Sequence, residues 1–432
     1  MSFLRAFIAR RVTRLLTSPD LRHLRRRWAA ARRRLLGQLP TVHSFHQVDD
    51  PYSHLAALQL QALTQRHAVR LVAHLVPAPD ASAAPDPERL GQWAARDAQR
   101  LALNLGLTAP EFRRTPSSVE LRNAQRVMAA SLAQDASGAG LAALSQQFWT
   151  GQLPVQSGPE AAAVLAQGRA LRARLGHYLG ATFYFEGEWY WGVDRLHFLE
   201  QRLQEQGLLR PGVPAEPRWR TPELAFHALP AGADRRPILH FYASLRSPYT
   251  ALAVPQVRRL AEHYGAELRI RLVLPMVMRG LPVPLSKRLY IVRDAKREAE
   301  RLGLTFGCIV DPVGEPTERG LAVLHHAIVR GRGPDFLESF LRGVFAQGLD
   351  AGSDASLLAM AESAGLGQED VAAALADDSW RAQAEANRMD MLTRGIWGVP
   401  SFRIDEAPAL WGQDRLWMLE QDLLAALQAP VR

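Results

Sequence analysis

Ser247 is the residue whose type and position best suit chemistry. It follows an apolar run from Ile238 to Leu245 that is typical of a buried strand, and Pro248 then opens a run with helical spacing. The backbone N–H groups and the dipole at a helix N-terminus favour a bound anion, so this position predicts an anion site. The Ser-Pro pair is also a common helix N-cap that needs no ligand, and both interpretations stay open.

The chain contains a single cysteine, Cys308, which excludes an internal disulfide framework and indicates a reducing, cytoplasmic setting. Its apolar neighbours predict a small buried residue rather than a nucleophile. His325 and His326 are adjacent in a helical run and therefore point to different faces, which argues against a metal site there. We expect no metal.

The same pattern occurs twice in the chain. His43–Ala56 shares His, Pro, Tyr, Leu and Ala in register with His240–Ala253. Trp191–Gln201 repeats as Trp411–Gln421, with Trp-Gly-x-Asp-Arg-Leu and Leu-Glu-Gln in common. An opening strand-helix and a closing strand-helix thus recur together, which predicts a tandem duplication of one domain.

The spacing of apolar residues and the positions of glycine and proline predict the helices and strands that would position Ser247. The order in the second half is β-α-β, a helical insertion, and then β-β-α. The predicted elements are a strand at 237–245, a helix at 248–264, a strand at 268–274, helices across 286–394, a hairpin at 399–404 and 409–411, and a closing helix at 414–427.

Most of the net charge lies in residues 1–40. They contain eleven arginines against one acid, Asp20, whereas the whole 432-residue chain carries +9, so the remainder is close to neutral. Apolar residues recur there at helical spacing, which predicts a basic amphipathic helix that contacts an anionic membrane surface or nucleic acid. A solvated arginine-rich leader is the alternative. No apolar run approaches the roughly 18–20 residues of a transmembrane helix.

Three motifs in this order resemble one family: Arg246-Ser247-Pro248-Tyr249, Gly398-Val399-Pro400-Ser401 and Trp411-Gly412-Gln413-Asp414-Arg415-Leu416. They are similar to 2-hydroxychromene-2-carboxylate isomerases and kappa-class glutathione transferases, in the disulfide-bond-protein A-like group of thioredoxin folds. The resemblance covers residues 237–428 and, faintly, 41–208. It implies an α/β fold of two tandem thioredoxin-like domains, each with a helical insertion.

The expected organisation has four parts. An arginine-rich segment at 1–37 precedes a degenerate thioredoxin-like domain at 38–210. A linker at 211–234 leads to a second thioredoxin-like domain at 235–432, which would carry the glutathione site.

The resemblance also implies the site. Two hydroxyl residues, Ser247 and Thr250, stand where thioredoxin folds carry Cys-x-x-Cys, so dithiol chemistry is absent and Ser247 would stabilise a glutathione thiolate as the catalytic residue. Pro400 would follow a cis peptide bond. Glutathione, as cofactor or co-substrate, would act on a small unsaturated or aromatic-derived substrate in an isomerase or transferase reaction. The implied glutathione-binding residues are Lys287, Val399, Pro400, Gln413, Asp414 and Arg415.

In the first copy, the position of Ser247 is Asp50 and that of Pro400 is read as Thr182. A carboxylate caps a helix well but repels a thiolate, so we expect the first domain to have lost the site. It would then replace the partner subunit of a dimer and make the chain a monomer with an internal pseudo-dimer.

Other interpretations remain open at this point. Asp414 and Arg415 also fit a plain helix-start acid and a solvated base. The whole chain also fits a non-catalytic scaffold whose residues 1–40 bind a membrane or nucleic acid, or a family member labelled oxidoreductase that lacks Cys-x-x-Cys. The expected location is the cytoplasm, with the basic segment at the inner face of the membrane as one option.

Overall fold

The computed structural model describes residues 3–112, 114–230 and 235–428. It divides into two compact units. The C-terminal unit comprises Met1–Pro19, Pro222–Val283 and Arg288–Arg432, and the N-terminal unit comprises Asp20–Thr221 and Pro284–Lys287. The expected segment, linker and second domain each include a few residues outside the described ranges: 1–2, 231–234 and 429–432.

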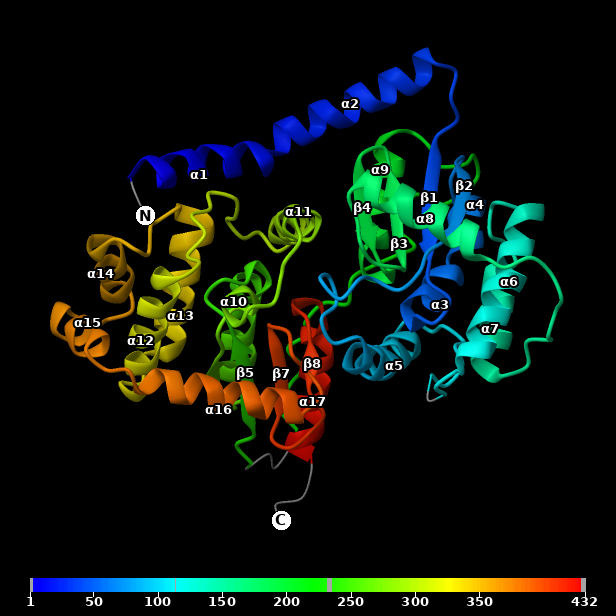
Figure 1. Ribbon diagram of the computed structural model, residues 1–432. Coiled ribbons are helices and arrows are strands. Elements are labelled where there is room, and N and C mark those ends of the chain that lie inside the picture. The colour runs from blue at the N-terminus through cyan, green and yellow to red at the C-terminus, as the bar shows by residue number, and fades with distance from the viewer. Residues whose placement is uncertain (1–2, 113, 231–234, 429–432) are drawn as a thin grey trace. The chain divides into compact units, whose positions relative to one another are not determined.

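The C-terminal unit is built on a four-stranded sheet in the order β6-β5-β7-β8 (Figure 1). Strand β5 pairs in parallel with β6 and antiparallel with β7, and β8 pairs with β7. Leu239 and Phe241 of β5 are buried, which explains the nearly continuous apolar run in the sequence. The strands are β5 (Ile238–Ala243), β6 (Glu267–Leu272), β7 (Ser401–Ile404) and β8 (Leu410–Trp411).

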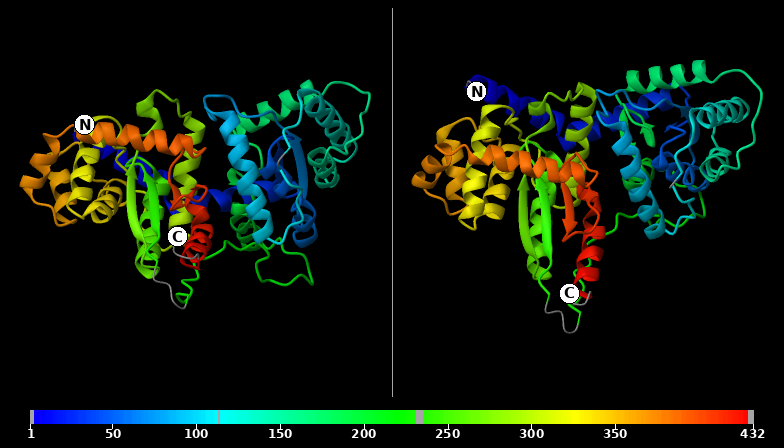
Figure 2. Two further views of the ribbon diagram at one scale, coloured as in Figure 1. Left: turned by 90° about the horizontal axis from the view of Figure 1, so that it is seen from below. Right: turned by 60° about the horizontal axis from the view of Figure 1, so that its bottom comes forward.

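Helices complete this unit in the predicted order. Helix α10 (Pro248–His263) joins β5 to β6, and α17 (Leu416–Gln428) follows the short helix η4 (Gln413–Arg415) and packs on β7 and α10. Helices α12 to α15 pack on one another as a cluster beside the sheet (Figures 1 and 2). The insertion contains η2 (Met276–Arg279), α11 (Leu285–Arg301), α12 (Glu315–Val329), α13 (Gly333–Arg342), η3 (Gly343–Gln347), α14 (Asp354–Glu362), α15 (Gln368–Leu375) and α16 (Ser379–Thr393).

The N-terminal unit has a second four-stranded sheet in the equivalent order, β2-β1-β3-β4. Its strand pairing repeats the same directions: β1 is parallel to β2 and antiparallel to β3, and β4 pairs with β3. The expected mixed α/β architecture is confirmed. The elements after residue 40 are β1 (Thr41–His46), α3 (Pro51–Ala57), α4 (Leu60–Arg66), β2 (Arg70–Leu75), α5 (Pro87–Asn104), α6 (Ser118–Gln134), α7 (Leu141–Thr150), α8 (Ala162–Leu175), β3 (Thr182–Phe185), β4 (Glu188–Trp191), η1 (Val193–Arg195) and α9 (Leu196–Glu205).

Strand register corrects one predicted equivalence. Phe45 pairs with Thr182 in the N-terminal unit, and Tyr242 pairs with Ser401 in the C-terminal unit. The counterpart of Thr182 is therefore Ser401, and the counterpart of Pro400 is Ala181. The N-terminal unit has no proline here to fix the alignment, and only the cross-strand pairing sets it.

The arginine-rich segment forms two helices that belong to different units. Helix α1 (Phe3–Leu16) belongs to the C-terminal unit, and nearly all of α2 (Pro19–Leu35) belongs to the N-terminal unit. Thr13 Oγ1 accepts a hydrogen bond from the N–H of Ile309 at 3.0 Å. Thr17 Oγ1 lies 2.7 Å from the Thr13 carbonyl and 3.2 Å from the Gly307 carbonyl, and its proton can go to either. Within the described ranges no helix combines the length and apolar character that a membrane span requires.

In each unit, one buried glutamate accepts hydrogen bonds from the backbone of the expected linker. Glu200 accepts hydrogen bonds from the backbone N–H groups of Arg218 and Trp219, at 3.1 and 3.0 Å. Glu420 does the same in the other unit. It accepts from the N–H groups of Ala225 and Phe226 at 2.8 and 2.6 Å. These are the glutamates of the repeated Leu-Glu-Gln motif, and hydrogen bonds to a carboxylate are among the stronger ones in proteins.

Candidate functional site

Ser247 is the N-cap of α10. Its Oγ accepts a hydrogen bond from the N–H of Thr250 at 3.1 Å, and Pro248 takes the first helical position, where a missing N–H costs nothing. The side chain is half-buried. The hydroxyl therefore sits at the positive end of a 16-residue helix and remains within reach of a ligand.

The peptide bond between Val399 and Pro400 is cis, as predicted. Ser247 Oγ lies 3.5 Å from the Val399 carbonyl oxygen, to which it donates. Hydroxyl hydrogen bonds are usually about 2.5–3.0 Å long, so this contact is weak and the hydroxyl proton can turn toward a better acceptor. Ser247, Val399 and Pro400, far apart in the sequence, thus meet at the start of α10.

The turn that begins η4 contacts Pro400 and therefore lies beside Ser247 and Val399. The N–H of Gly412 donates to the Pro400 carbonyl at 3.0 Å, and η4 packs against α10. Within η4, Asp414 and Arg415 form an ion pair at 3.5 Å, and Gln413 is buried. The Nε2 of Gln413 lies in the interior and has no hydrogen-bond partner among the described residues. A buried amide donor without an acceptor is costly, which makes this nitrogen a candidate for binding a polar ligand.

Lys287 lies near the start of α11, in the short stretch Pro284–Lys287. It belongs to the N-terminal unit, where its Nζ donates to the carbonyl of Ala83 at 2.8 Å and lies 5.8 Å from the centroid of the Tyr178 ring. Burial lowers the pKa of this ammonium group. Contacts within the C-terminal unit link the other six predicted site residues, and the role expected of Lys287 stays a prediction.

Two polar contacts beside the site were not anticipated from the sequence. Arg246 forms a two-pronged ion pair with Asp311, at 2.6 and 2.7 Å. Tyr249, in the first turn of α10, donates to the buried carboxylate of Asp294 at 2.8 Å, and Arg297 pairs with the other oxygen at 2.9 Å. Both contacts fix the segment around Ser247.

The Tyr249–Asp294 contact has a counterpart in the N-terminal unit, where Tyr52 donates to Asp97 at 2.6 Å. The signal was present in the sequence, since Arg-Asp-Ala occurs at both 96–98 and 293–295, with Leu-Gly-Leu-Thr following at the same spacing. Because both units share the contact, we assign it to the fold rather than to catalysis.

Two tryptophans form the wall of the turn between α16 and β7. Trp397 and Trp411 pack edge to face with ring centroids 4.7 Å apart. A Cβ on Gly398 would lie 2.1 Å from the Trp411 ring, so only glycine fits between them. These rings pack the turn that carries Val399 and Pro400.

Asp50 is the N-cap of α3 in the N-terminal unit, as Ser247 is the N-cap of α10. Its carboxylate accepts from the N–H groups of Tyr52 and Ser53 and from the Ser53 hydroxyl at 2.8 Å. Burial raises the pKa of Asp50 to about 6. At neutral pH this group is an anion with no proton to donate, and Ala181 replaces the cis proline beside it. No metal-binding group of three or more His, Cys, Asp or Glu residues occurs in the part of the chain that the structure describes.

The fold and these motifs define a known class of domain. Residues 238–424 match the family model of the DSBA-like thioredoxin domain, so the C-terminal half of the chain is such a domain. We find no curated protein that matches the sequence significantly.

Solved structures resemble parts of the chain. One is a 2-hydroxychromene-2-carboxylate isomerase, with 20% identity, a TM-score of 0.37, and coverage of 43% of this chain and 93% of that one. Another is a probable DsbA oxidoreductase from Streptomyces coelicolor, with 22% identity, a TM-score of 0.37, and coverage of 46% and 93%. A third is the cytosolic disulfide reductase DsbM from Pseudomonas aeruginosa, with 21% identity, a TM-score of 0.35, and coverage of 44% and 97%. At such low identities and TM-scores these likenesses do not bear on activity.

Proposed function

We propose that the C-terminal unit binds glutathione as its thiolate and uses it to isomerise or conjugate a small unsaturated or aromatic-derived substrate. The observation that carries the proposal is the Ser247 hydroxyl. It lies at the N-terminus of α10 next to the cis Val399–Pro400 bond. It donates its proton to the Val399 carbonyl in a weak contact of 3.5 Å. A thiolate at this position would receive the hydroxyl proton in a stronger, charge-assisted hydrogen bond.

The sulfur in this reaction has to come from a ligand. The only cysteine, Cys308, is buried, and its Sγ would lie 2.6 Å from a Cβ placed on Gly348, on the side of the unit that faces α1. A single cysteine cannot cycle between an internal dithiol and a disulfide. A DSBA-like domain that lacks the Cys-x-x-Cys dithiol is suited to a thiol supplied by a ligand.

The remaining contacts fit the peptide part of glutathione. The backbone of Val399 would pair with the cysteinyl residue. The Asp414 carboxylate would take the γ-glutamyl ammonium, while Gln413 Nε2 and Arg415 offer donors for its carboxylate. Lys287, expected to bind the glycyl carboxylate, donates one of its three N–H groups to the Ala83 carbonyl and keeps two for a ligand.

The chemistry follows from a bound thiolate. The sulfur lone pair forms a C–S bond with the electron-poor carbon of a conjugated double bond, and the π electron pair moves onto the conjugated carbonyl oxygen. Rotation about the resulting single bond and expulsion of the thiolate gives the isomer, with the double bond restored. If the intermediate takes a proton at carbon instead, the thioether conjugate remains. The protein contributes positioning and thiolate stabilisation.

We also propose that the two halves arose by duplication and that the N-terminal unit has kept the fold without the site. The equivalent strand orders, the two Tyr–Asp contacts and the two glutamates that hold the linker support this. Such a unit could replace a dimer partner within one chain. A mass in solution of two chains would contradict that role.

Calorimetric titration of the full chain with reduced glutathione tests the proposed function. We expect one site per chain with affinity in the micromolar to millimolar range. Ser247→Ala should weaken binding roughly tenfold or more, because a hydrogen bond to a charged group is worth about 1.5–3 kcal/mol. Ser247→Asp keeps the N-cap and adds a repelling charge, so it should abolish binding.

Asp50→Ser is the matched control, because it changes the same N-cap position in the other unit. It should leave the affinity unchanged. No binding by the wild-type chain, or equal losses in the Ser247 and Asp50 variants, would overturn the proposal.

A further inference from the structure

Helix α1 is attached to its unit through small and polar side chains. Ala6 is buried, Arg10 Nε donates to the Gly348 carbonyl at 2.7 Å, and Thr13 and Thr17 bond to the backbone of residues 307–309. These four residues recur every three or four positions and therefore share one face of the helix. The face of α1 that packs on the unit is not its apolar face.

The apolar residues of α1 lie on the opposite face. Leu4, Ile8, Val12 and Leu15 are each between 50% and 63% exposed, and at 3.6 residues per turn they form one stripe directly across from Ala6 and Thr13. Arginines flank the stripe on both sides: Arg5 on one, Arg11 and Arg14 on the other. A helix that belongs only to a soluble domain normally has the reverse arrangement, with its apolar stripe toward the core.

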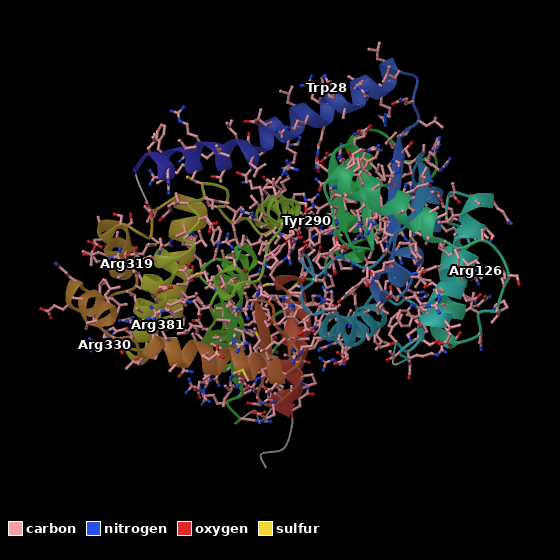
Figure 3. All side chains as sticks on the ribbon, viewed as in Figure 1. Trp28, Arg126, Tyr290, Arg319, Arg330 and Arg381 are labelled. Atoms are coloured by element: carbon pink, nitrogen blue, oxygen red, sulfur yellow. The ribbon has the colours of Figure 1, made fainter. Side chains whose placement is uncertain are left out.

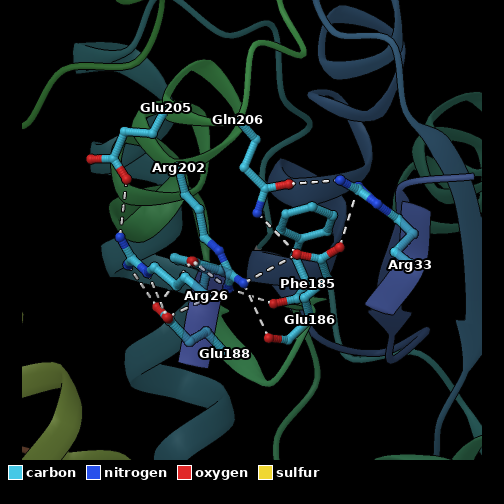
Figure 4. A network of polar contacts seen from close by, with 9 residues as sticks. Arg26, Arg33, Phe185, Glu186, Glu188, Arg202, Glu205 and Gln206 are labelled. Carbon is cyan, nitrogen blue, oxygen red and sulfur yellow. Dashed lines mark hydrogen bonds and ion pairs between the residues drawn. The ribbon is translucent and has the colours of Figure 1, made fainter. Parts of the chain in front are cut away.

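Helix α2 independently shows the same inversion. Its inner face carries Arg26, which bonds to Glu188 at 2.7 and 2.8 Å, and Arg33, which bonds to Gln206 at 3.1 Å and pairs with Glu186 at 3.2 Å (Figure 4). The network extends to Glu205 and to Arg202, whose guanidinium lies 4.8 Å from the centroid of the Phe185 ring. The helix is therefore held to its unit mainly by ion pairs.

The outer face of α2 presents another apolar stripe. Leu24, Trp28 and Leu35 are 60%, 67% and 87% exposed and lie across the helix from Arg26 and Arg33 (Trp28 is labelled in Figure 3). Exposed arginines border this stripe on both sides as well. They are Arg25 and Arg32 on one side and Arg27 and Arg34 on the other.

We propose that α1 and α2 each bind the surface of an anionic lipid bilayer through these stripes. A central apolar band with cations along both edges matches a surface that has hydrocarbon beneath a layer of negative headgroups. Arginine stems can lie along the apolar boundary while the guanidinium groups reach phosphate, and tryptophan favours this interface. Each helix carries its own stripe, so the proposal holds for either helix alone.

Charge and shape favour lipid over the other occupants. Nucleic acid would bind the arginines through its phosphates but would leave Leu24, Trp28 and Leu35 in water, since a phosphate backbone offers them no apolar surface. A second copy of the chain would bring arginine rows against arginine rows. In a bilayer rich in phosphatidylglycerol, the acyl chains would contact the apolar stripe and the anionic headgroups would bind the arginines beside it.

Vesicle co-sedimentation of the full chain tests the proposal. We expect binding to vesicles of phosphatidylglycerol and phosphatidylcholine, reduced by salt, and little binding to pure phosphatidylcholine. Two variants remove one stripe each: Leu4→Ser with Ile8→Ser in α1, and Leu24→Ser with Trp28→Ser in α2. Each should lower the partition coefficient roughly tenfold or more, given what burying one such side chain is worth.

The matched control is Leu103→Ser with Val329→Ser, at two apolar side chains that are 71% and 76% exposed on helices elsewhere. It should bind vesicles like the wild type. Trp28→Phe adds a readout that leaves the fold intact. The difference spectrum between the wild type and this variant should show Trp28 emission shifting to the blue with anionic vesicles.

Three results would overturn the proposal. One is unchanged vesicle binding in both stripe variants. Another is no Trp28 shift with anionic vesicles while duplex DNA binds tightly. The third is a chain that self-associates through the stripes and ignores vesicles.

Discussion

Ser247 and Asp50 show how one side chain changes what the same local structure can do. Both cap the N-terminus of the helix that follows the first strand of their sheet, and both precede a proline. The serine hydroxyl has a proton to donate, whereas the ionised carboxylate only accepts. A helix N-terminus with a hydroxyl can therefore receive an anion, and the same terminus with a carboxylate already contains one.

Asp50 gives a pH-dependent prediction at the residue scale. Burial raises the pKa of this carboxyl to about 6 from an ordinary value near 4, so its contribution to stability is fully present below the ordinary value and is lost as pH rises through about 6. Asp50→Asn keeps an N-cap without the charge. The variant should therefore gain stability relative to the wild type between pH 4.5 and 7.

Urea unfolding of the N-terminal unit, followed at several pH values, measures this difference. The expected gain is on the order of 2–3 kcal/mol, from about two pKa units at 1.36 kcal/mol each. Ser247→Asn is the control in the other unit, where no such trend should appear. A difference that does not vary with pH would mean that the carboxyl is solvated.

At the scale of elements, α1 depends on a close approach at Gly307. This residue has a φ of +125°, and a Cβ there would lie 2.3 Å from Thr17 Oγ1. Gly307→Ala should push α1 away from residues 307–309 and cost roughly 1–3 kcal/mol of unfolding free energy. Hydrogen exchange in residues 4–17 should rise accordingly.

Gly303→Ala provides the matched comparison. Gly303 also has a positive φ, +68°, but has nothing within 4 Å of a Cβ. It should share the backbone strain and leave exchange in α1 unchanged. Equal effects of the two substitutions on α1 would show that Thr17 does not hold the helix.

The sequence predicted the elements better than the contacts between them. The strands, α10 and the helical insertion followed from hydrophobic period, and the cis Val399–Pro400 bond was implied by the family that the three motifs resemble. The register that pairs Thr182 with Phe45 could not be read, because a strand pattern has period two and says nothing of its partner. The sequence also could not show that α1 packs in the C-terminal unit, because the face of α1 that packs there is polar.

The candidate site was predictable in part for the same reason. Ser247, Val399, Pro400 and residues 413–415 stand in motifs whose chain order implies proximity in the fold. Lys287 does not, and its bond to Ala83 depends on packing over some two hundred positions of sequence. Glu200 and Glu420 stand in a sequence repeat, so their equivalence could be predicted. Their bonds to the linker could not, because the sequence does not show where residues 218–226 lie in the fold.

At the scale of the whole molecule, the two units differ in their buried histidines. Burial lowers the pKa of His43, His46, His54, His67 and His74 in the N-terminal unit, with His46 at about 3 and His54 at about 4; in the C-terminal unit it lowers that of His240 to about 4. A histidine with a lowered pKa contributes stability above pH 6.5 that is lost as pH falls through its folded value. The N-terminal unit should therefore unfold first in acid.

Hydrogen-exchange mass spectrometry between pH 6.5 and 4 checks this order peptide by peptide. A histidine such as His46 or His54 adds up to about 1.4 kcal/mol per pH unit to the slope between its folded pKa and pH 6.5, and Asp50 opposes it. His54→Gln should reduce the slope by about one proton. Simultaneous exposure of both units would contradict the expectation.

The path of the chain between the units has a consequence during synthesis. Thr13 and its partner Ile309 are 296 positions apart, so at about 5–20 residues per second roughly 15–60 s pass between their translation. During that time the N-terminal unit can fold with α2 packed on it. Helix α1 has no packing partner yet, and the nascent chain carries it in that state until residues 307–309 have been made.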